Sequence, residues 1–128
     1  MTREERVRGR QRWRATPGPC VSALEYVLGA IGADLVNGLQ ILGRSRRVAI
    51  EQVEARVEGE LNNPLTYLGV LGESGHPGLE KVRVRVYLAS SEEETAIHRL
   101  WHEMLATSPL VHTFQAAIQL ELTLQVVV

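Results

Sequence analysis

The chain has 128 residues, 45% of them hydrophobic and 23% charged, and its net charge at pH 7 is −1. A chain of this length and composition is suited to one domain with a buried core. Charged residues interrupt its apolar runs, so we expect no membrane span, and the near-zero net charge offers nucleic acid no overall attraction. The sequence therefore predicts a single soluble domain.

The first residues of the chain are locally basic. They contain only two acidic residues, Glu4 and Glu5, against Arg3, Arg6, Arg8, Arg10, Arg12 and Arg14. We interpret residues 1–16 as a basic arm or short strand, with the strand expected over 7–14. Nucleic acid binding is the less favoured role for this arm, because Trp13 is its only aromatic residue.

Cys20 is the only cysteine, so no disulfide can form within the chain. A fold held by packing alone is typical of a reducing compartment, and the N-terminal residues lack the apolar run of a secretory signal. We therefore expect a cytoplasmic location.

A long helix is expected after the prolines of residues 17–19. Ser22 and Glu25 have the spacing of a capping box, and the apolar pattern then continues to Leu42, followed by Gly43 as a C-cap. Between residues 24 and 42 the only charges are Glu25 and Asp34. A helix this apolar on all sides belongs in the interior, so we expect it to be the central helix of a domain over 17–128.

Alternating apolar residues predict strands over 48–61, with a bulge near Glu51 and Gln52, and over 79–89. The stretch 62–78 between them has an apolar middle and is interpreted as a functional lid or a partner contact. A second helix is expected from a capping box at Ser91 to Thr107.

The C-terminal part begins with Ser108 and Pro109, which fit the N-cap and first position of a new helical turn. Strict alternation over 118–128 then predicts a last strand. Few strands and one buried helix indicate an α+β domain.

Two segments resemble the OsmC/Ohr family, named for osmotic induction and organic hydroperoxide resistance. Residues 22–39, SALEYVLGAIGADLVNGL, are similar to its central helix, with Gly18-Pro19 as the entry, and residues 107–111 are similar to its Cys-Pro-Val segment. The resemblance implies an OsmC-like fold with an antiparallel sheet, a long buried central helix and a shortened N-terminal strand region. It also implies an intertwined homodimer with its sites at the interface.

The resemblance places Asp34 and Ser108 where the family has its peroxidatic and its resolving cysteine. Hydroperoxide reduction by this route needs a thiolate, which neither residue supplies. We therefore expect no cysteine-based hydroperoxide reductase activity. The expected role is that of a small-ligand-binding or structural homodimer. Its candidate ligand-binding residues are Glu25, Asp34, Ser108, Arg12 and Arg14.

Other roles remain open for these residues. Cys20 is a candidate relocated thiol for a divergent thiol peroxidase in the stress response, and Ser108 with His112 is a candidate hydrolase pair. A salt bridge to an arginine is an equal alternative for Asp34, local capping is favoured for Glu25, and an N-cap role is favoured for Ser108.

His98 and His102 have a spacing that can chelate a metal. We interpret them as surface residues because no third ligand motif accompanies them. No metal site and no cofactor are expected.

Overall fold

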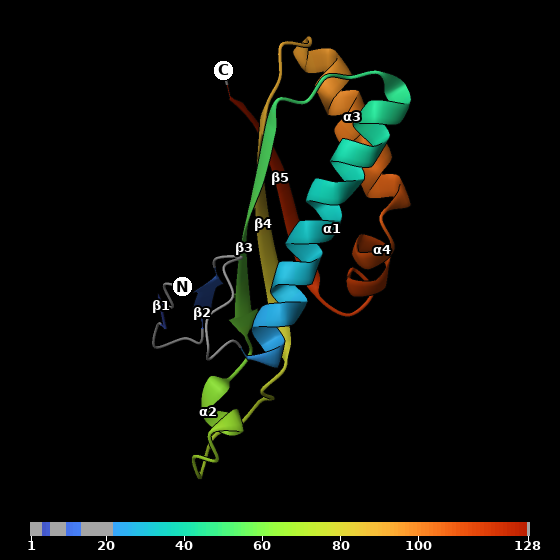
Figure 1. Cartoon of the computed structure of the whole chain (residues 1–128). Coiled ribbons are helices and arrows are strands. Elements are labelled where there is room, and N and C mark those ends of the chain that lie inside the picture. The colour runs from blue at the N-terminus through green and yellow to red at the C-terminus, as the bar shows by residue number, and fades with distance from the viewer. Residues whose placement is uncertain (1–3, 6–9, 14–21, 128) are drawn as a thin grey trace.

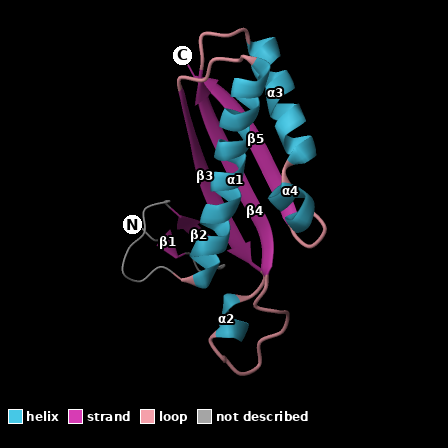
Figure 2. Ribbon diagram, turned by 45° about the vertical axis from the view of Figure 1, so that its right-hand side comes forward, coloured by secondary structure: helices cyan, strands magenta, loops and turns pink. Residues whose placement is uncertain are grey.

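The computed structural model describes residues 4–5, 10–13 and 22–127. One five-stranded sheet carries three helices on one face, and a fourth, short helix lies beyond the end of the sheet (Figures 1 and 2). The elements in chain order are β1 (Glu4–Glu5), β2 (Arg10–Trp13), α1 (Ala23–Arg46), β3 (Gln52–Leu61), α2 (Pro64–Tyr67), β4 (Leu79–Ala89), α3 (Glu94–Thr107), α4 (Pro109–Phe114) and β5 (Gln119–Val127).

The strands lie in their sequence order, and the sheet is mixed. Three neighbouring pairs are antiparallel, whereas β4 and β5 are parallel. Parallel neighbours cannot be joined by a tight turn, and here α3 and α4 form the connection. The expectation of a wholly antiparallel sheet is therefore corrected at this pair.

The expected bulge lies elsewhere on β3. The register between β3 and β4 shifts between Glu60 and Leu61, not near Glu51 and Gln52. Residues 48–51 precede the strand, and the Glu51 amide donates to the Ala89 carbonyl at 2.9 Å. This bond brings the chain into line with β4 before the regular ladder begins.

The start of α1 agrees with the sequence pattern, but its end does not. Ser22 is the N-cap, and its hydroxyl accepts a hydrogen bond from the Glu25 amide at 3.3 Å. The helix continues past Gly43 to Arg46, and Arg47 takes the left-handed cap conformation with φ of 58°. Gly43 instead allows close packing, because a Cβ there would lie 2.9 Å from the Ile50 Cδ1.

One side of α1 faces the core, and the other is exposed within this chain. The core side buries Leu28, Ile31, Leu35 and Leu39 completely or nearly so. The opposite side exposes Tyr26, Ala30, Ala33, Asn37 and Ile41. The expected central helix is thus buried on one side only.

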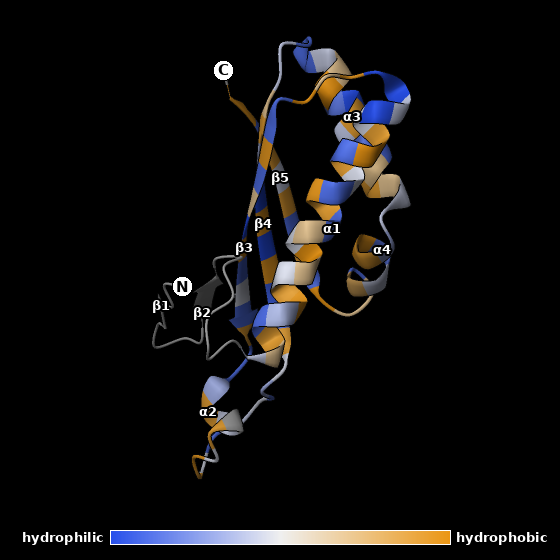
Figure 3. Cartoon of the chain, viewed as in Figure 1, coloured by the Kyte–Doolittle hydropathy of each residue, from blue (hydrophilic) through white to orange (hydrophobic). Residues whose placement is uncertain are grey.

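By length and hydropathy α1 could also cross a membrane, which the interrupted charge pattern did not lead us to expect. Only 33% of that apolar segment is buried inside the chain. The hydropathy view shows apolar and polar residues mixed along the helix (Figure 3). Packing on the sheet accounts for the core side of α1 and leaves its other side unexplained.

The second helix, α3, is amphipathic as expected and buries Ile97, Leu100, Trp101 and Met104. Its predicted capping box does not form, because the helix begins at Glu94 with Glu93 as an N-cap that makes no side-chain bond. The turn before it is held by Ser90, whose hydroxyl accepts from the Glu92 amide at 3.0 Å. The predicted cap of α4 is present: the Val111 amide donates to the Ser108 hydroxyl at 3.2 Å.

Candidate functional site

The candidate site is formed by Asp34 in the middle of α1 and Ser108 between α3 and α4. Ser108 is held in place by capping α4, and α1 packs against both of these helices. The Ser108 hydroxyl donates a hydrogen bond to Oδ2 of Asp34, 74 residues away in the sequence. Ser108 is buried and Asp34 is half-buried, so the pair connects the protein interior to the surface.

The electrostatic setting of Asp34 decides between the two roles expected for it. Among the described residues Ser108 is its only hydrogen-bond partner, and none of their lysines or arginines forms an ion pair with it. The salt bridge considered as an alternative is therefore not found there. A carboxylate has two acceptor oxygens. Among the described residues only Oδ2 of Asp34 is bonded, which makes Oδ1 the candidate acceptor for a hydrogen-bond donor or a cation.

Glu25 lies apart from this pair. Asp34 follows it by nine residues, about two and a half turns of helix, so the two carboxylates point to opposite sides of α1. Glu25 is 4% exposed. Its Oε1 accepts from the Ser22 hydroxyl at 3.5 Å, and its Oε2 has no hydrogen-bond partner in the described part of the chain. The serine half of the predicted capping box is confirmed, whereas the Glu25 side chain bonds the Ser22 hydroxyl and not the Ser22 backbone amide. One ligand cannot contact both carboxylates directly.

The structure does not assemble the Ser108–His112 pair. The His112 Nε2 lies 2.7 Å from the carbonyl oxygen of Ala106, and its Nδ1 lies 3.5 Å from the side-chain Nε2 of Gln115. The Ser108 hydroxyl is engaged with Asp34 and the Val111 amide. A nucleophile and its base need a mutual hydrogen bond, which this geometry does not provide.

The remaining candidates are placed only in part. His98 and His102 are exposed on α3, and the described ranges contain no group of three side chains that could hold a metal ion. The backbone of Arg12 belongs to β2. Its side chain, and all of Arg14 and Cys20, lie outside what the structure describes, so the relocated-thiol hypothesis stays a prediction.

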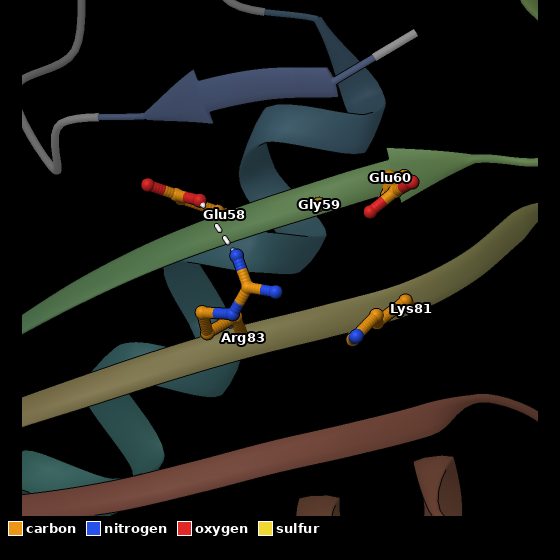
Figure 4. Close-up of a pocket in the computed structure, with 5 residues that line it drawn as sticks. All are labelled: Glu58, Gly59, Glu60, Lys81 and Arg83. Carbon is orange, nitrogen blue, oxygen red and sulfur yellow. Dashed lines mark hydrogen bonds and ion pairs between the residues drawn. The ribbon is translucent and has the colours of Figure 1, made fainter. Parts of the chain in front are cut away.

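A shallow hollow on the far face of the sheet was not predicted (Figure 4). Arg83 lies between two carboxylates there, with its Nε 2.8 Å from Glu121 and its NH1 3.4 Å from Glu58. Lys81 lies 2.8 Å from the other oxygen of Glu121. The hydrogen bonds from Lys81 and Arg83 lower the pKa of Glu121.

Opposite charges are paired across neighbouring strands here, so we interpret the hollow as part of a surface ion-pair network. The alternation of charged residues along β3 and β4 was the signal that would have indicated it.

Comparisons with known proteins agree with this fold. The family model described as OsmC-like protein matches residues 16–123. No curated protein matches the sequence at the level required for a relative.

Similar solved structures include an OsmC-like protein from Mycoplasma pneumoniae, with a TM-score of 0.70, 14% identity, and coverage of 99% of this chain and 95% of that one. An organic hydroperoxide resistance protein OsmC from Legionella pneumophila has a TM-score of 0.64 and 10% identity, over 84% of this chain and 72% of that one. A putative osmotic stress induced and detoxification response protein from Psychrobacter arcticus has a TM-score of 0.64 and 10% identity, over 97% and 93%. Identities this low show a shared fold, and the family model covers most of the sequence. The chain therefore belongs to the OsmC-like protein family.

Proposed function

We propose that this chain is an OsmC-like protein without cysteine-pair peroxidase chemistry, and that it binds a small polar ligand at Asp34 and Ser108 as a cytoplasmic homodimer. The observation that carries this proposal is the hydrogen bond from Ser108 to Asp34. It links α1 to the start of α4 at a half-buried carboxylate that has no charged partner among the described residues.

The contact itself supports the positions that the resemblance assigns. Two cysteines that form a disulfide must lie side by side, with their Cα atoms roughly 4.4–6.8 Å apart. Asp34 and Ser108 are distant in sequence, yet their side chains touch. In our proposal these two residues replace the thiol pair, and neither a carboxylate nor a hydroxyl can pass through a sulfenic acid.

The chemistry of the pair indicates the class of ligand. The Ser108 hydroxyl donates its hydrogen bond to Asp34 and accepts one from the Val111 backbone amide. The pair therefore presents acceptor oxygens to a ligand. A ligand that donates hydrogen bonds or carries a positive charge complements it. We therefore propose a small amine, amidine or polyhydroxy compound rather than an anion.

The exposed side of α1 supports a homodimer. A two-fold axis requires a surface that complements itself. An axis between residues 33 and 34 pairs Tyr26 with the partner's Ile41 and brings the small Ala33 side chains together. Crossing helices are closest at their centre, where small residues allow close approach. This arrangement places each Asp34 beside the interface.

A role in the stress response is the broader part of the proposal. Organic hydroperoxide resistance is part of the name of the Legionella protein and describes that protein. In our proposal this chain does not use a thiol to reduce hydroperoxides. Cys20-dependent peroxidase activity is the outcome that would argue for the other function.

The test is a binding screen by thermal shift with small amines, guanidines and sugars, followed by calorimetry of the compounds that bind. Asp34→Asn is expected to weaken binding of a cationic ligand at least roughly tenfold, because the charge-assisted hydrogen bond is lost. Glu25→Gln, on the opposite side of α1, is the matched control and is expected to leave the affinity unchanged.

Two results would contradict the proposal. One is thiol-dependent turnover of cumene hydroperoxide by the wild-type protein that disappears in Cys20→Ser. The other is a ligand whose affinity responds to Glu25→Gln and not to Asp34→Asn.

A further inference from the structure

The segment between β3 and β4 is an ordered projection, which we call the α2 arm (residues 62–78). Its stem is closed by hydrogen bonds. The backbone N–H of Asn62 donates to the Gly78 carbonyl at 2.9 Å, and the backbone N–H of Asn63 donates to the His76 carbonyl at 2.9 Å. The Asn63 side-chain nitrogen donates to the Ser74 carbonyl at 2.7 Å. Its Oδ1 caps α2 by accepting a hydrogen bond from the Leu65 backbone amide at 3.0 Å. The arm therefore has a defined shape.

The tip of this ordered arm is apolar. Leu71 is 96% exposed and Leu68 is 69% exposed, with Val70 and Leu65 also open to solvent. Figures 1 and 3 show the arm beyond the end of the sheet, away from the core. Ordering a chain costs conformational entropy, and a clustered apolar surface is typical of a contact site. The tip is thus suited to cover by another protein surface.

The size of the α1 surface argues for a second copy as the occupant. A stable interface takes roughly 20–30 residues from each partner. Between Tyr26 and Ile41, α1 exposes far fewer residues than that, and those in the middle are small. In the proposed homodimer a further surface on each subunit would therefore take part.

Charge complementarity indicates where the arm would reach. The arm contains one acidic residue, Glu73, and no lysine or arginine. The C-terminal end of α1 exposes Arg44 and Arg47, neither of which has an acidic partner among the described residues. The arm lies beyond the N-terminal end of its own α1 (Figures 1 and 2). In an antiparallel pair of helices, that end lies beside the partner's C-terminal end.

We propose that the α2 arm of each subunit docks on the C-terminal end of α1 of the second copy. Leu71 joins Tyr26 of its own chain in covering the exposed Ile41 of the second copy, and Glu73 lies beside Arg44 of that copy. This inference rests on the homodimer of the proposed function and assigns the second surface that the dimer needs. It gives the apolar middle of residues 62–78 a partner contact rather than the role of a lid over its own site.

Disulfide trapping tests the arm directly. In a Cys20→Ser background, a Leu71→Cys chain is co-expressed with an Ile41→Cys chain that carries a larger tag, and the purified protein is oxidised with copper phenanthroline. A mixed disulfide of the two differently sized chains is expected, because only contact between subunits can join them. Leu71→Cys co-expressed with Gln115→Cys is the control and is expected to give none.

A second measurement uses the charges. Glu73→Arg and Arg44→Glu are each expected to raise the dimer dissociation constant several-fold, and the double variant is expected to recover part of the loss. Leu71→Asp is expected to raise that constant at least roughly tenfold, measured by analytical ultracentrifugation.

The outcomes separate the arm from the dimer. If Ala33→Cys chains cross-link to each other while the Leu71 and Ile41 pair does not, the dimer stands and the arm contact is wrong. If neither pair cross-links and light scattering shows a monomer, the homodimer of the proposed function fails and the arm contact fails with it.

Discussion

The two sides of α1 both carry apolar residues, yet one side is buried against the sheet and the other is exposed. Leu28 and Leu35 face the sheet and are 0% exposed, whereas Tyr26 and Ile41 on the other side are 64% and 65% exposed. The core side combines leucines and isoleucine with two closely packed glycines, and the exposed side has small residues at its centre. The sheet of the same chain covers the first side, and the proposed homodimer would cover the second side with another helix. High overall hydropathy alone does not distinguish the two cases.

Removing a large side chain from the core side of α1 is expected to have the largest effect on stability. Leu35→Ala is expected to lower the free energy of unfolding by about 3 kcal/mol, because it leaves a cavity against the sheet. Urea denaturation followed by circular dichroism measures this loss, which is expected at every protein concentration.

Ile41→Ala on the exposed side is the matched change. Its effect is expected to depend on protein concentration, because in the proposed homodimer it would act through association of the chains. A loss equal to that of Leu35→Ala at all concentrations would show that the exposed side is completed within one chain.

Two glycines of α1 sharpen the same contrast. A Cβ at Gly32 would lie 2.8 Å from the Val57 Cγ2, whereas a Cβ at Gly29 would have no neighbour within 4 Å. Gly29→Ala is expected to stabilise the chain by about 0.5–1 kcal/mol through helix propensity. Gly32→Ala makes the same gain but crowds β3, so we expect it to be about 1–2 kcal/mol less stable than Gly29→Ala. Equal melting temperatures for the two variants would contradict the close packing of α1 on β3.

The smallest expected effect on stability comes from a substitution on the face of the sheet opposite the helices. Hydrogen bonds from Lys81 and Arg83 lower the pKa of Glu121 below its ordinary value of 4.5. A lowered carboxyl pKa stabilises the folded chain above that ordinary value, and the contribution is lost as the pH falls through the folded-state pKa. Glu121→Gln is expected to lower the urea midpoint slightly at pH 7.

At acidic pH the wild type and Glu121→Gln should converge. A difference between them that grows below pH 4.5 would show that the ion pairs do not act as the structure indicates. The exposure of these groups keeps the effect small.

Several local patterns were read correctly because the chain decides these features within a few residues. The cap at Ser22, the cap at Ser108 and the limits of β4 follow from short-range hydrogen bonds and from alternation. The end of α1 was misjudged because Gly43 is needed for its small size beside Ile50, not for its backbone freedom. The cap of α3 was misjudged because Ser90 holds the turn where Ser91 was expected to act.

The candidate site was also predicted only in part from the sequence. The sequence by itself singled out Asp34, because a charge within an apolar helix needs a partner, and singled out Ser108 as a cap. Only the tertiary structure decided that these two residues meet, that Asp34 has a neutral partner, and that Glu25 points away from both. It also decided the parallel pairing of β4 with β5. The physical reason is one of distance along the chain: capping and alternation act over a few residues, whereas these contacts join segments that only the packing of helices on the sheet brings together.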